Sequence, residues 1–367
     1  MTITLRDKTR PVRIGTLQVG GGAPIAVQSM TNTDTRDVEA TCDQIQRLAA
    51  AGCDIVRVAI PDQKAAQALG KIRQKTTLPL VADIHFSHRL ALMALDAGVD
   101  KLRINPGNIG SKERVQEVVR AAQSRGVPIR IGVNAGSLEK DLLAKYGRAT
   151  PQAMVESALK HVAILEELGF FDILISVKAF DVLTTWQAYR LLASRRNYPL
   201  HIGITEAGTP RAGSIRSAVG LGLILGQGLG DTIRVSLTGD PVEEVRVGYE
   251  ILKALNLRQR GPILISCPTC GRCQIDLPRL ANEVERRLAH INQPVAVAVM
   301  GCEVNGPGEA READIGIAGG KNAAYLFRHG QMVRKLSTDE VVDLLVHEVE
   351  NLAKQMEGEG DGRAGPK

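Results

Sequence analysis

The sequence predicts an α/β protein in which a closed barrel of eight βα units precedes a small α+β domain. Eight short runs rich in β-branched residues recur up to residue 237, with amphipathic stretches between them. A short polar break, RQRGP, then separates this part from a C-terminal stretch that does not continue the βα repeat. Eight such units fit a TIM (β/α)8 barrel, which takes about 250 residues, and a doubly wound open sheet is the alternative.

The barrel strands are predicted from runs in which Val, Ile and Leu dominate. These runs lie at 24–30, 54–60, 79–85, 101–107, 128–134, 172–178, 199–205 and 231–237. Between them, stretches such as SKERVQEVVRAAQSRGV repeat apolar residues at helical spacing, and several end at glycine, as helix C-termini do. In a barrel of this kind, the functional site lies at the carboxyl ends of the strands.

The chain is predicted to divide into two domains. We expect the barrel over 1–257, a linker over 258–262, a second domain over 263–355 and a disordered tail over 356–367. The second domain reads as strand ILIS, a cysteine loop, helix LPRLANEVERRLAHI, strand VAVAVMG, and strands near DIGIA and AYLFRHGQMVRKL. Its last helix begins at the capping box Ser337-x-x-Glu340. The tail offers no apolar anchor.

Composition excludes several classes of protein. The 367 residues carry a net charge of +6, but Lys and Arg are dispersed and aromatic residues make up only 3%, so stacking platforms for nucleic acid are scarce. No apolar run reaches the roughly 20 residues of a membrane span. The opening MTITLRDKTRPVRIG lacks the apolar core of a secretory signal. We therefore expect a soluble cytoplasmic protein that binds an anionic small molecule, with no nucleic acid and no membrane among its partners.

Four of the six cysteines fall in one short part of the chain and predict a metal centre. Cys267, Cys270 and Cys273 form a C-x2-C-x2-C run, and Cys302 follows in a second loop. Thiolates at this spacing curl around one centre, which is iron–sulfur or zinc. A disulfide framework fits badly in a protein expected to stay in the cytoplasm. The other two cysteines are expected to be small buried hydrophobes.

Basic residues recur within or at the ends of five predicted strands, where an unpaired charge is costly to bury. They are Arg57, Arg103, Arg130, Lys178 and Arg234. The two-residue period of a strand puts polar residues on the same faces, among them Asn105, Asn134, Ser176, His201, Thr205 and Ser236. Facing into the barrel mouth, these side chains form a pocket for a polyanion, since Arg favours bidentate contacts with phosphate. The alternative is that each basic residue pairs with a carboxylate such as Asp83 or Glu206, or lies on the outer face.

The loop after Cys302, CEVNGPGEAREADIGIAGG, is rich in glycine but follows neither the Walker A nor the Rossmann pattern. Glu309 lies seven residues after Cys302. It is either a solvated loop residue or an iron ligand more labile than thiolate, which leaves one iron available to substrate. Both readings stay open on the residues alone.

Several motifs together resemble one enzyme family. They are ISCPTCGRC, VMGCEVNGPGEAREADIGIAGG, KLRINPGNIG, RIGVNAGSLE, HIGITEAG and DTIRVSL. Over nearly its full length the chain is similar to the 4-hydroxy-3-methylbut-2-enyl diphosphate synthase family of the non-mevalonate isoprenoid pathway. The resemblance implies a TIM barrel joined to a [4Fe-4S] domain that acts on 2-C-methyl-D-erythritol 2,4-cyclodiphosphate. It also implies flavodoxin or ferredoxin as the donor of two electrons, with the open allylic diphosphate and water as products.

The resemblance also implies roles for individual residues. The family's cluster ligands fall on Cys267, Cys270, Cys302 and Glu309. Its diphosphate clamp falls on Arg57, Arg103, Arg130, Lys178 and Arg234, helped by Asn134, Thr205 and Ser236. Glu206 in ITEAG becomes a candidate proton donor near the reacting carbons, and Asp83 and His85 are assigned to the pocket. Cys273 is not among the family's ligands, although four cysteines could saturate a cluster in place of Glu309.

Two other functions fit parts of the sequence. A zinc knuckle that binds RNA or a protein partner would use the four cysteines, but it gives the five strand-borne cations no purpose. A barrel that binds a pterin or a corrinoid, with a cluster as auxiliary, is the second alternative. Colour separates iron–sulfur from zinc, because only protein that carries iron–sulfur is brown when it is purified without oxygen.

The connection between the domains predicts a head-to-tail homodimer. Barrel helices run antiparallel to the strands, so the helix that ends near Leu257 finishes at the face opposite the mouth. The break at 258–262 spans at most roughly 18 Å, whereas that helix is about 25 Å long. A cluster tethered there would not reach its own barrel mouth. Each cluster domain is therefore expected to cover the barrel of the other subunit.

Overall fold

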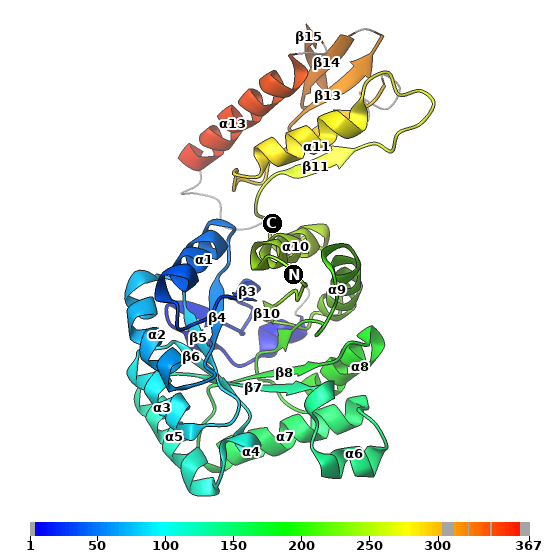
Figure 1. Ribbon diagram of the computed structural model, residues 1–367. Coiled ribbons are helices and arrows are strands. Elements are labelled where there is room, and N and C mark those ends of the chain that lie inside the picture. The colour runs from blue at the N-terminus through cyan, green and yellow to red at the C-terminus, as the bar shows by residue number, and fades with distance from the viewer. Residues whose placement is uncertain (1–3, 303–311, 322, 338–339, 360–367) are drawn as a thin grey trace. The chain divides into compact units, whose positions relative to one another are not determined.

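The computed structural model describes residues 4–302, 312–321, 323–337 and 340–359, and Figure 1 shows their helices and strands. The chain divides into two compact units, Met1–Arg258 and Gln259–Lys367. The first is a barrel, and the second is a mixed sheet that packs against two helices. No helix in the described ranges combines the length and the apolar character that crossing a membrane requires.

Eight parallel strands form the barrel. They are β3 (Ala26–Met30), β4 (Ile55–Ala59), β5 (Leu80–Asp83), β6 (Lys101–Ile104), β7 (Ile129–Asn134), β8 (Ile173–Lys178), β9 (His201–Ile202) and β10 (Thr232–Ile233). Their order is β8-β7-β6-β5-β4-β3-β10-β9, and a parallel bridge between Ile175 and Leu200 closes the ring. Each predicted run contains one of these strands, so the predicted TIM barrel is confirmed and the open-sheet alternative is wrong.

Helices follow each barrel strand and surround the sheet (Figure 1). The longer ones are α1 (Val38–Ala50), α2 (Gln63–Lys75), α3 (His88–Asp96), α5 (Lys112–Ser124), α7 (Pro151–Glu167), α8 (Val182–Ala193), α9 (Pro210–Leu225) and α10 (Pro241–Ala254). Short Asp, Ser or Thr side chains cap six of them at the first turn, which satisfies backbone N–H groups there. The connections also hold α4 (Pro106–Ile109), α6 (Lys140–Tyr146), η1 (Leu5–Lys8) and η2 (Ala135–Ser137).

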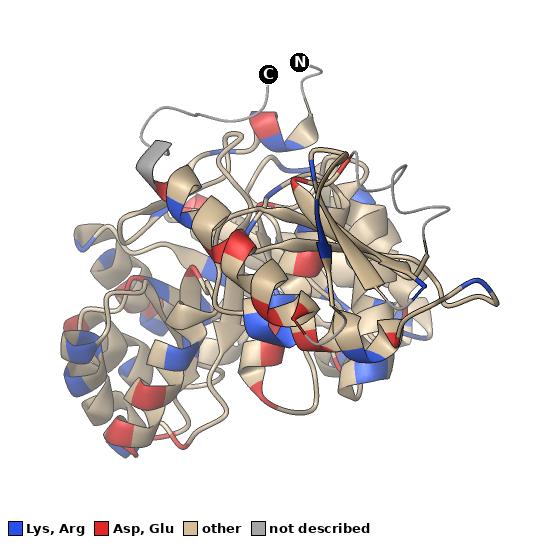
Figure 2. Cartoon of the chain, turned by 90° about the horizontal axis from the view of Figure 1, so that it is seen from above, with Lys and Arg blue, Asp and Glu red and all other residues tan. Residues whose placement is uncertain are grey.

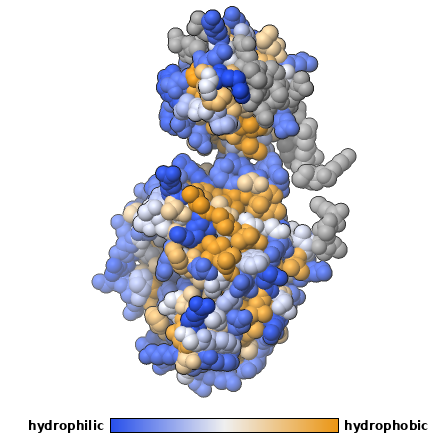
Figure 3. All heavy atoms as spheres, turned by 90° about the vertical axis from the view of Figure 1, so that its right-hand side faces the viewer, coloured by the Kyte–Doolittle hydropathy of each residue, from blue (hydrophilic) through white to orange (hydrophobic). Residues whose placement is uncertain are grey.

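One face of the barrel exposes apolar side chains, and Figure 3 shows hydrophobic residues gathered on the side that carries α8 and α9. On α9, Ile215 is 61% exposed, Val219 52% and Leu223 39%. These residues recur every four positions and form a stripe along the helix. Phe180 and Leu183, at the start of the neighbouring α8, are also more than half exposed.

An apolar hairpin that the sequence patterns did not predict fills the amino end of the barrel. β1 (Val12–Ile14) and β2 (Leu17–Val19) pair antiparallel across a turn in which Gly15 has φ +58°. Their buried side chains pack with apolar residues near the amino ends of barrel strands, namely Ala26, Ile55, Val81 and Leu174. Because this hairpin fills the interior at the amino ends of the strands, the polar part of the interior lies toward their carboxyl ends.

The second unit is built on a five-stranded sheet. Its strands, in spatial order, are β11 (Ile263–Ser266), β12 (Ala296–Met300), β13 (Ile315–Gly320), β14 (Ala323–Arg328) and β15 (Gln331–Leu336). The first three are parallel, and the remaining pairings are antiparallel. α11 (Leu277–Leu288) and α13 (Val341–Glu359) pack on the sheet through a core that includes Val284, Val297 and Leu345.

The last helix is longer than the sequence predicts. α13 continues to Glu359, whereas the disordered tail was expected from residue 356. Ala353 is still buried, and the Met and Glu residues that follow favour helix, so the helix extends beyond its packed part. The expected start of the tail is therefore corrected, and residues 360–367 lie outside the described ranges.

Candidate active site

Basic side chains from five strands gather toward the carboxyl end of the barrel interior. Arg57 belongs to β4, Arg103 to β6, Arg130 to β7 and Lys178 to β8, and Arg234 directly follows β10. The exposed fraction is only 5% for Arg103, 2% for Arg130 and 7% for Lys178. On the outer surface, Lys and Arg are interspersed with Asp and Glu (Figure 2), whereas this interior is dominated by positive charge. Such a pocket favours a polyanion.

A buried carboxylate at the end of β5 pairs with two of these cations. Asp83 lies 3.4 Å from Arg57, and an equal distance separates it from Arg103 and from His85. Burial raises the pKa of the Asp83 carboxyl, but the charge of Arg57, followed by His85 and Arg103, outweighs burial and holds this pKa well below its usual range. The structure thus places Asp83 and His85 beside the cations. Arg57 and Arg103 each pair with a carboxylate, Asp83, as the alternative to a free cation pocket expected.

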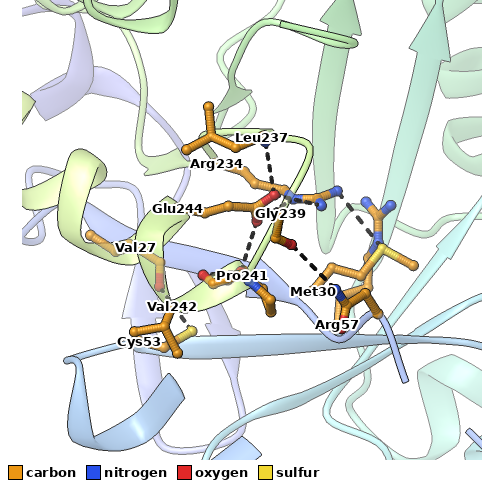
Figure 4. Close-up of polar contacts among 12 residues, drawn as sticks. Val27, Met30, Cys53, Arg57, Arg234, Leu237, Gly239, Pro241, Val242 and Glu244 are labelled. Atoms are coloured by element: carbon orange, nitrogen blue, oxygen red, sulfur yellow. Dashed lines mark hydrogen bonds and ion pairs between the residues drawn. The ribbon is translucent and has the colours of Figure 1, made fainter. Parts of the chain in front are cut away.

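Glu244 of α10 is a second buried carboxylate, and it positions Arg234 (Figure 4). Its oxygens lie 3.4 Å from Nε and from Nη2 of Arg234, and one of them accepts a hydrogen bond of 2.8 Å from Ser29 Oγ. The Met30 sulfur accepts contacts from Arg57 Nε at 3.1 Å and from Arg234 Nη1 at 3.7 Å. The thioether therefore lies between the two guanidinium groups.

Glu244 is not among the site residues predicted from the sequence, although the helical pattern carries a signal for it. In PVEEVRVGYEILKA, Glu244 shares a face with Gly248 and Ile251, and the structure buries all three. A carboxylate within the buried stripe of a barrel helix needs a polar partner, because burying it alone is costly. That partner is Arg234.

Arg130 and Lys178 stand outside these ion pairs. Among the described residues, the buried pairs of the pocket join Arg57 and Arg103 to Asp83 and Arg234 to Glu244. Arg130 donates from Nη1 to Ser176 Oγ at 2.6 Å, whereas its buried Nε and Nη2 have no acceptor in the described chain.

Burial and neighbouring positive charge disfavour the charged forms of both side chains. Burial lowers the pKa of Arg130 and of Lys178 well below the usual ranges, and neighbouring cations lower both further. Burial likewise lowers the pKa of Arg57, to about 10. Buried N–H groups without acceptors, among like charges, favour a bound anion.

Two glycines make room for the cations. A Cβ at Gly132 of β7 would lie 2.7 Å from Arg103 Nε, and a Cβ at Gly203 would lie 2.3 Å from the Arg234 carbonyl oxygen and 2.8 Å from Lys178 Nζ. The Gly132 carbonyl oxygen also accepts from Arg103 Nη2 at 2.8 Å, and its N–H donates to Asn105 Oδ1 at 3.0 Å. Glycine at 132 therefore leaves room for the Arg103 side chain, and glycine at 203 leaves room for the backbone of Arg234 as well as for Lys178.

Gly132→Ala should weaken binding of a diphosphate ligand while the barrel still folds. The new methyl group displaces the Arg103 side chain rather than backbone, so the loss falls on anion binding. Losing one charge-assisted hydrogen bond corresponds to roughly tenfold or more in affinity, measured by calorimetric titration with inorganic pyrophosphate. Gly136→Ala is the matched control, because a Cβ there meets nothing within 4 Å. Equal affinities for the two variants would contradict this account of Gly132.

The remaining predicted residues of the barrel lie at the carboxyl ends of their strands. Asn134 ends β7, and Thr205 and Ser236 follow β9 and β10; all three are partly buried. Glu206 is exposed, with φ +54°, a left-handed backbone that costs a residue other than glycine about 1–3 kcal/mol. Asn256 and His329 share this backbone, so the role of Glu206 stays a prediction.

The cysteine loops of the second unit follow two adjacent parallel strands. Cys267 comes directly after β11, and Cys302 follows β12 after one glycine. That glycine, Gly301, donates its N–H to Cys267 Sγ at 3.3 Å, and a Cβ on it would lie 2.6 Å from Cys273 Sγ. The loops therefore bring thiols to one edge of the sheet. The six cysteines form no disulfide with one another.

The chemistry of this donor set fits an iron–sulfur cluster. Thiols on loops at the ends of parallel strands, with a backbone N–H donating to sulfur, are typical of cluster ligands. In the part of the chain that the structure describes, no three Cys, His, Asp or Glu side chains are arranged to hold a metal ion, and Glu309 lies outside that part. The ligand set stays a prediction. Cys42 and Cys53 are buried, and burial raises the pKa of Cys53 to about 12.

Fold and site define a class of protein, an enzyme whose TIM barrel receives a polyanion and whose second domain carries thiols suited to a metal cluster. The description "GcpE TIM-barrel domain" matches residues 9–249, and "GcpE protein C-terminal domain" matches residues 263–351. The chain belongs to the GcpE family.

Curated relatives match nearly the whole chain. The 4-hydroxy-3-methylbut-2-en-1-yl diphosphate synthase (flavodoxin) of Geobacter sulfurreducens is 64% identical over 348 residues, 95% of this chain and 99% of that protein. The protein of the same name from Symbiobacterium thermophilum is 62% identical, over 97% of this chain and 96% of its own. Among solved structures, the Yersinia pestis dihydropteroate synthase is similar at a TM-score of 0.48 and 15% identity, over 67% of this chain and 98% of that one. The family expected from the motifs is confirmed.

Proposed function

We propose that this chain catalyses reductive ring opening and dehydroxylation of 2-C-methyl-D-erythritol 2,4-cyclodiphosphate to (E)-4-hydroxy-3-methylbut-2-enyl diphosphate. It is an oxidoreductase of isoprenoid biosynthesis, as the names of its relatives support. The cyclic dianion takes up two electrons and one proton. One bond from carbon to the diphosphate and one bond from carbon to hydroxyl break, and the products are the open trianion and water. Family membership does not favour the zinc-knuckle or the pterin and corrinoid alternatives.

One observation carries this proposal, the excess of buried cations over carboxylates in the barrel. Arg130 and Lys178 offer N–H groups outside the ion pairs of the pocket, and the phosphates of the substrate provide the acceptors. Asp83, Glu244 and Met30 hold the other three cations in fixed positions, so the clamp is organised before substrate arrives. As the ring opens, the leaving oxygen gains charge, and these preorganised cations stabilise it.

We assign the remaining polar residues of the mouth to substrate orientation and proton transfer. Asn134, Thr205 and Ser236, at or after the carboxyl ends of β7, β9 and β10, would donate hydrogen bonds to the substrate. The Glu206 carboxyl, exposed at the rim, is the candidate donor of the proton that leaves with the hydroxyl group as water.

We assign Cys267, Cys270, Cys302 and Glu309 as the residues that would hold a [4Fe-4S] cluster. When bound, the cluster supplies the electrons of the reaction, which no side chain can supply. Cys273 is left outside this set, and its thiol instead donates to the Ile275 carbonyl oxygen at 3.2 Å. Because the relatives are named for flavodoxin, we propose reduced flavodoxin in the cytoplasm as the electron donor.

We further propose that the enzyme is a head-to-tail homodimer. Arg258, the last residue of the barrel unit, bonds to Asp54 at 2.9 Å and to the Ile25 carbonyl oxygen at 3.0 Å. Both partners directly precede barrel strands, so the chain leaves the barrel at the end opposite the mouth. The apolar stripe of α9 and its neighbours on α8 supply a surface that a second copy would cover.

Val219→Glu should shift the protein from dimer to monomer. A charge placed in the middle of the α9 stripe would be buried without a partner, which weakens association on the order of a hundredfold or more. Sedimentation at micromolar concentration measures the change. Leu143→Glu, an equally simple exchange of an exposed apolar residue on α6, is the control and should leave the dimer intact. A dimer that survives Val219→Glu unchanged would show that the stripe is not the contact.

Conversion of the cyclic diphosphate tests the function. Protein purified without oxygen should be brown and contain iron, and with a reductant it should convert the cyclic diphosphate to the linear product, as phosphorus NMR follows directly. Omitting the reductant should leave the substrate intact. A colourless protein that contains zinc, or an iron-loaded and reduced protein that leaves the cyclic diphosphate unchanged, overturns the proposal.

A further inference from the structure

A sixth cation lies deeper in the barrel than the five of the mouth. Lys101 opens β6, and its exposed fraction is 0%. Its Nζ lies 3.0 Å from the Oε1 atom of Gln28 on β3. In the sheet, β4 and β5 separate β3 from β6, so this contact crosses the barrel interior. Lys101 precedes Arg103 by two residues and shares its inward face, one layer below the clamp.

The layer around Lys101 is polar, and the described residues supply no carboxylate to it. His201 bonds through Nδ1 to Thr232 Oγ1 at 2.8 Å, whereas its Nε2 and the Nε2 of Gln28 are buried without a partner in the described chain. Burial lowers the pKa of His201 well below its usual range, with Lys178 next in effect, so this imidazole is neutral. The charged groups that face the interior from the surrounding elements are Arg57, Asp83, Arg103, Arg130, Lys178, Arg234 and Glu244.

The charges of this interior do not balance if all groups are ionised. Six cations face two carboxylates, Asp83 and Glu244, an excess of four positive charges among the described residues. The cyclic substrate brings two negative charges and the open product brings three. Like charges at low dielectric repel strongly, so the empty barrel must shed positive charge. Arginine does not release its proton in proteins, whereas a buried lysine does.

Lys101 is the group best placed to release a proton. It is completely buried, and the hydrogen-bond partner that it has within the described chain, Gln28, is uncharged. Burial lowers the pKa of Lys101 well below its usual range, and Arg130 and Arg57 lower it further. Lys178, by contrast, lies in the mouth itself, where it would touch the bound anion.

We propose that Lys101 is the charge-balancing residue of the barrel, neutral while the mouth is empty and protonated from solvent when the diphosphate binds above it. The inference rests on the proposed function, because it needs a diphosphate as the ligand. One N–H bond forms on Nζ at the expense of a solvent proton, and no electron moves. Lys101 thus acts through the field of the pocket and needs no contact with substrate.

Proton uptake on binding tests this role. The probe is the cyclic diphosphate with reductant withheld, since each of its phosphorus atoms carries only one, strongly acidic, hydroxyl group and the probe itself does not titrate near neutral pH. Calorimetric titrations in buffers of different ionisation enthalpy give the number of protons taken up. The wild type should take up about one more proton than Lys101→Met at neutral pH. Lys64→Met, an exposed lysine on α2, should take up as many as the wild type.

The outcomes separate this inference from the proposed function. An absence of binding in the wild type speaks against the function. Binding without proton uptake, or equal uptake by wild type and Lys101→Met, overturns the role of Lys101 and directs attention to Lys178 or His201. Because Lys101 loses a proton on folding, the unliganded Lys101→Met variant should unfold at a higher temperature than the wild type.

A second variant keeps the test open if Lys101→Met does not fold. Gln28→Met retains the lysine but removes its acceptor, and the protonated amine loses more than the neutral amine because its hydrogen bond is charge-assisted. The pH range over which protons are taken up should therefore move to lower values. An unchanged range would contradict the assignment to Lys101.

Discussion

Cys302→Ser loses its iron and its activity together. The thiol is buried at the end of β12, next to the loop that follows β11, and a serine hydroxyl is a poor iron ligand because it stays protonated at neutral pH. Iron content and visible absorption of protein purified without oxygen measure the first loss. Conversion of the cyclic diphosphate measures the second. This double loss is the largest effect that we expect from one substitution in the second domain.

Cys273→Ser is the matched control for Cys302→Ser. The Cys273 thiol donates to the Ile275 carbonyl oxygen at 3.2 Å, and a serine hydroxyl can make the same hydrogen bond in less space beside Gly301. Iron and most of the activity should remain. Loss of iron from this variant would make Cys273 a ligand and displace Glu309 from the proposed set. Glu309→Ala should keep its fold and turn over more slowly.

Arg130→Met should lower kcat/KM for the cyclic diphosphate by roughly 10- to 150-fold, the equivalent of a charge-assisted hydrogen bond worth about 1.5–3 kcal/mol. Both KM and kcat should change, because the clamp binds the substrate and also orients it. Steady-state kinetics with the reduced enzyme provide the measurement.

Stability distinguishes this effect from damage to the fold. Arg130 is buried with two nitrogens that find no acceptor among the described residues, so methionine of similar length should leave the unfolding temperature unchanged or higher. Arg120→Met, on the exposed side of α5, should change neither kinetics nor stability. Wild-type kinetics in Arg130→Met would mean that this guanidinium takes no part in binding.

The barrel could be predicted because its strands are buried on both sides. Parallel strands of this kind are short continuous apolar runs, and the eight runs stand apart from the amphipathic helices between them. The hairpin of β1 and β2 was not predicted because its strands are only three residues long, too short for a periodic signal. The end of α13 was predicted too early because residues of high helix propensity extend the helix beyond its last packed residue.

The site was predictable where it depends on strand periodicity. Alternation alone placed Arg103, Arg130 and Lys178 on the same strand faces as other polar residues, and in the structure all three side chains are buried. Glu244 depends on how α10 packs on the strands, and the space beside Gly132 depends on the rotamer of Arg103. Both depend on tertiary packing, which cannot be deduced from a single sequence. The roles of the cysteines and of Glu206 came from family resemblance rather than from physical pattern.

Mixed dimers test most directly the claim that one active site needs a barrel from one copy and a cluster domain from another. Arg130→Met and Cys302→Ser subunits, each nearly inactive alone, are co-expressed with different tags and the heterodimer is isolated. In a head-to-tail dimer, one of the two sites then has an intact mouth and intact cysteines, so about half of the wild-type activity should return. A verified heterodimer no more active than its parents would contradict the shared site and place each cluster over its own barrel.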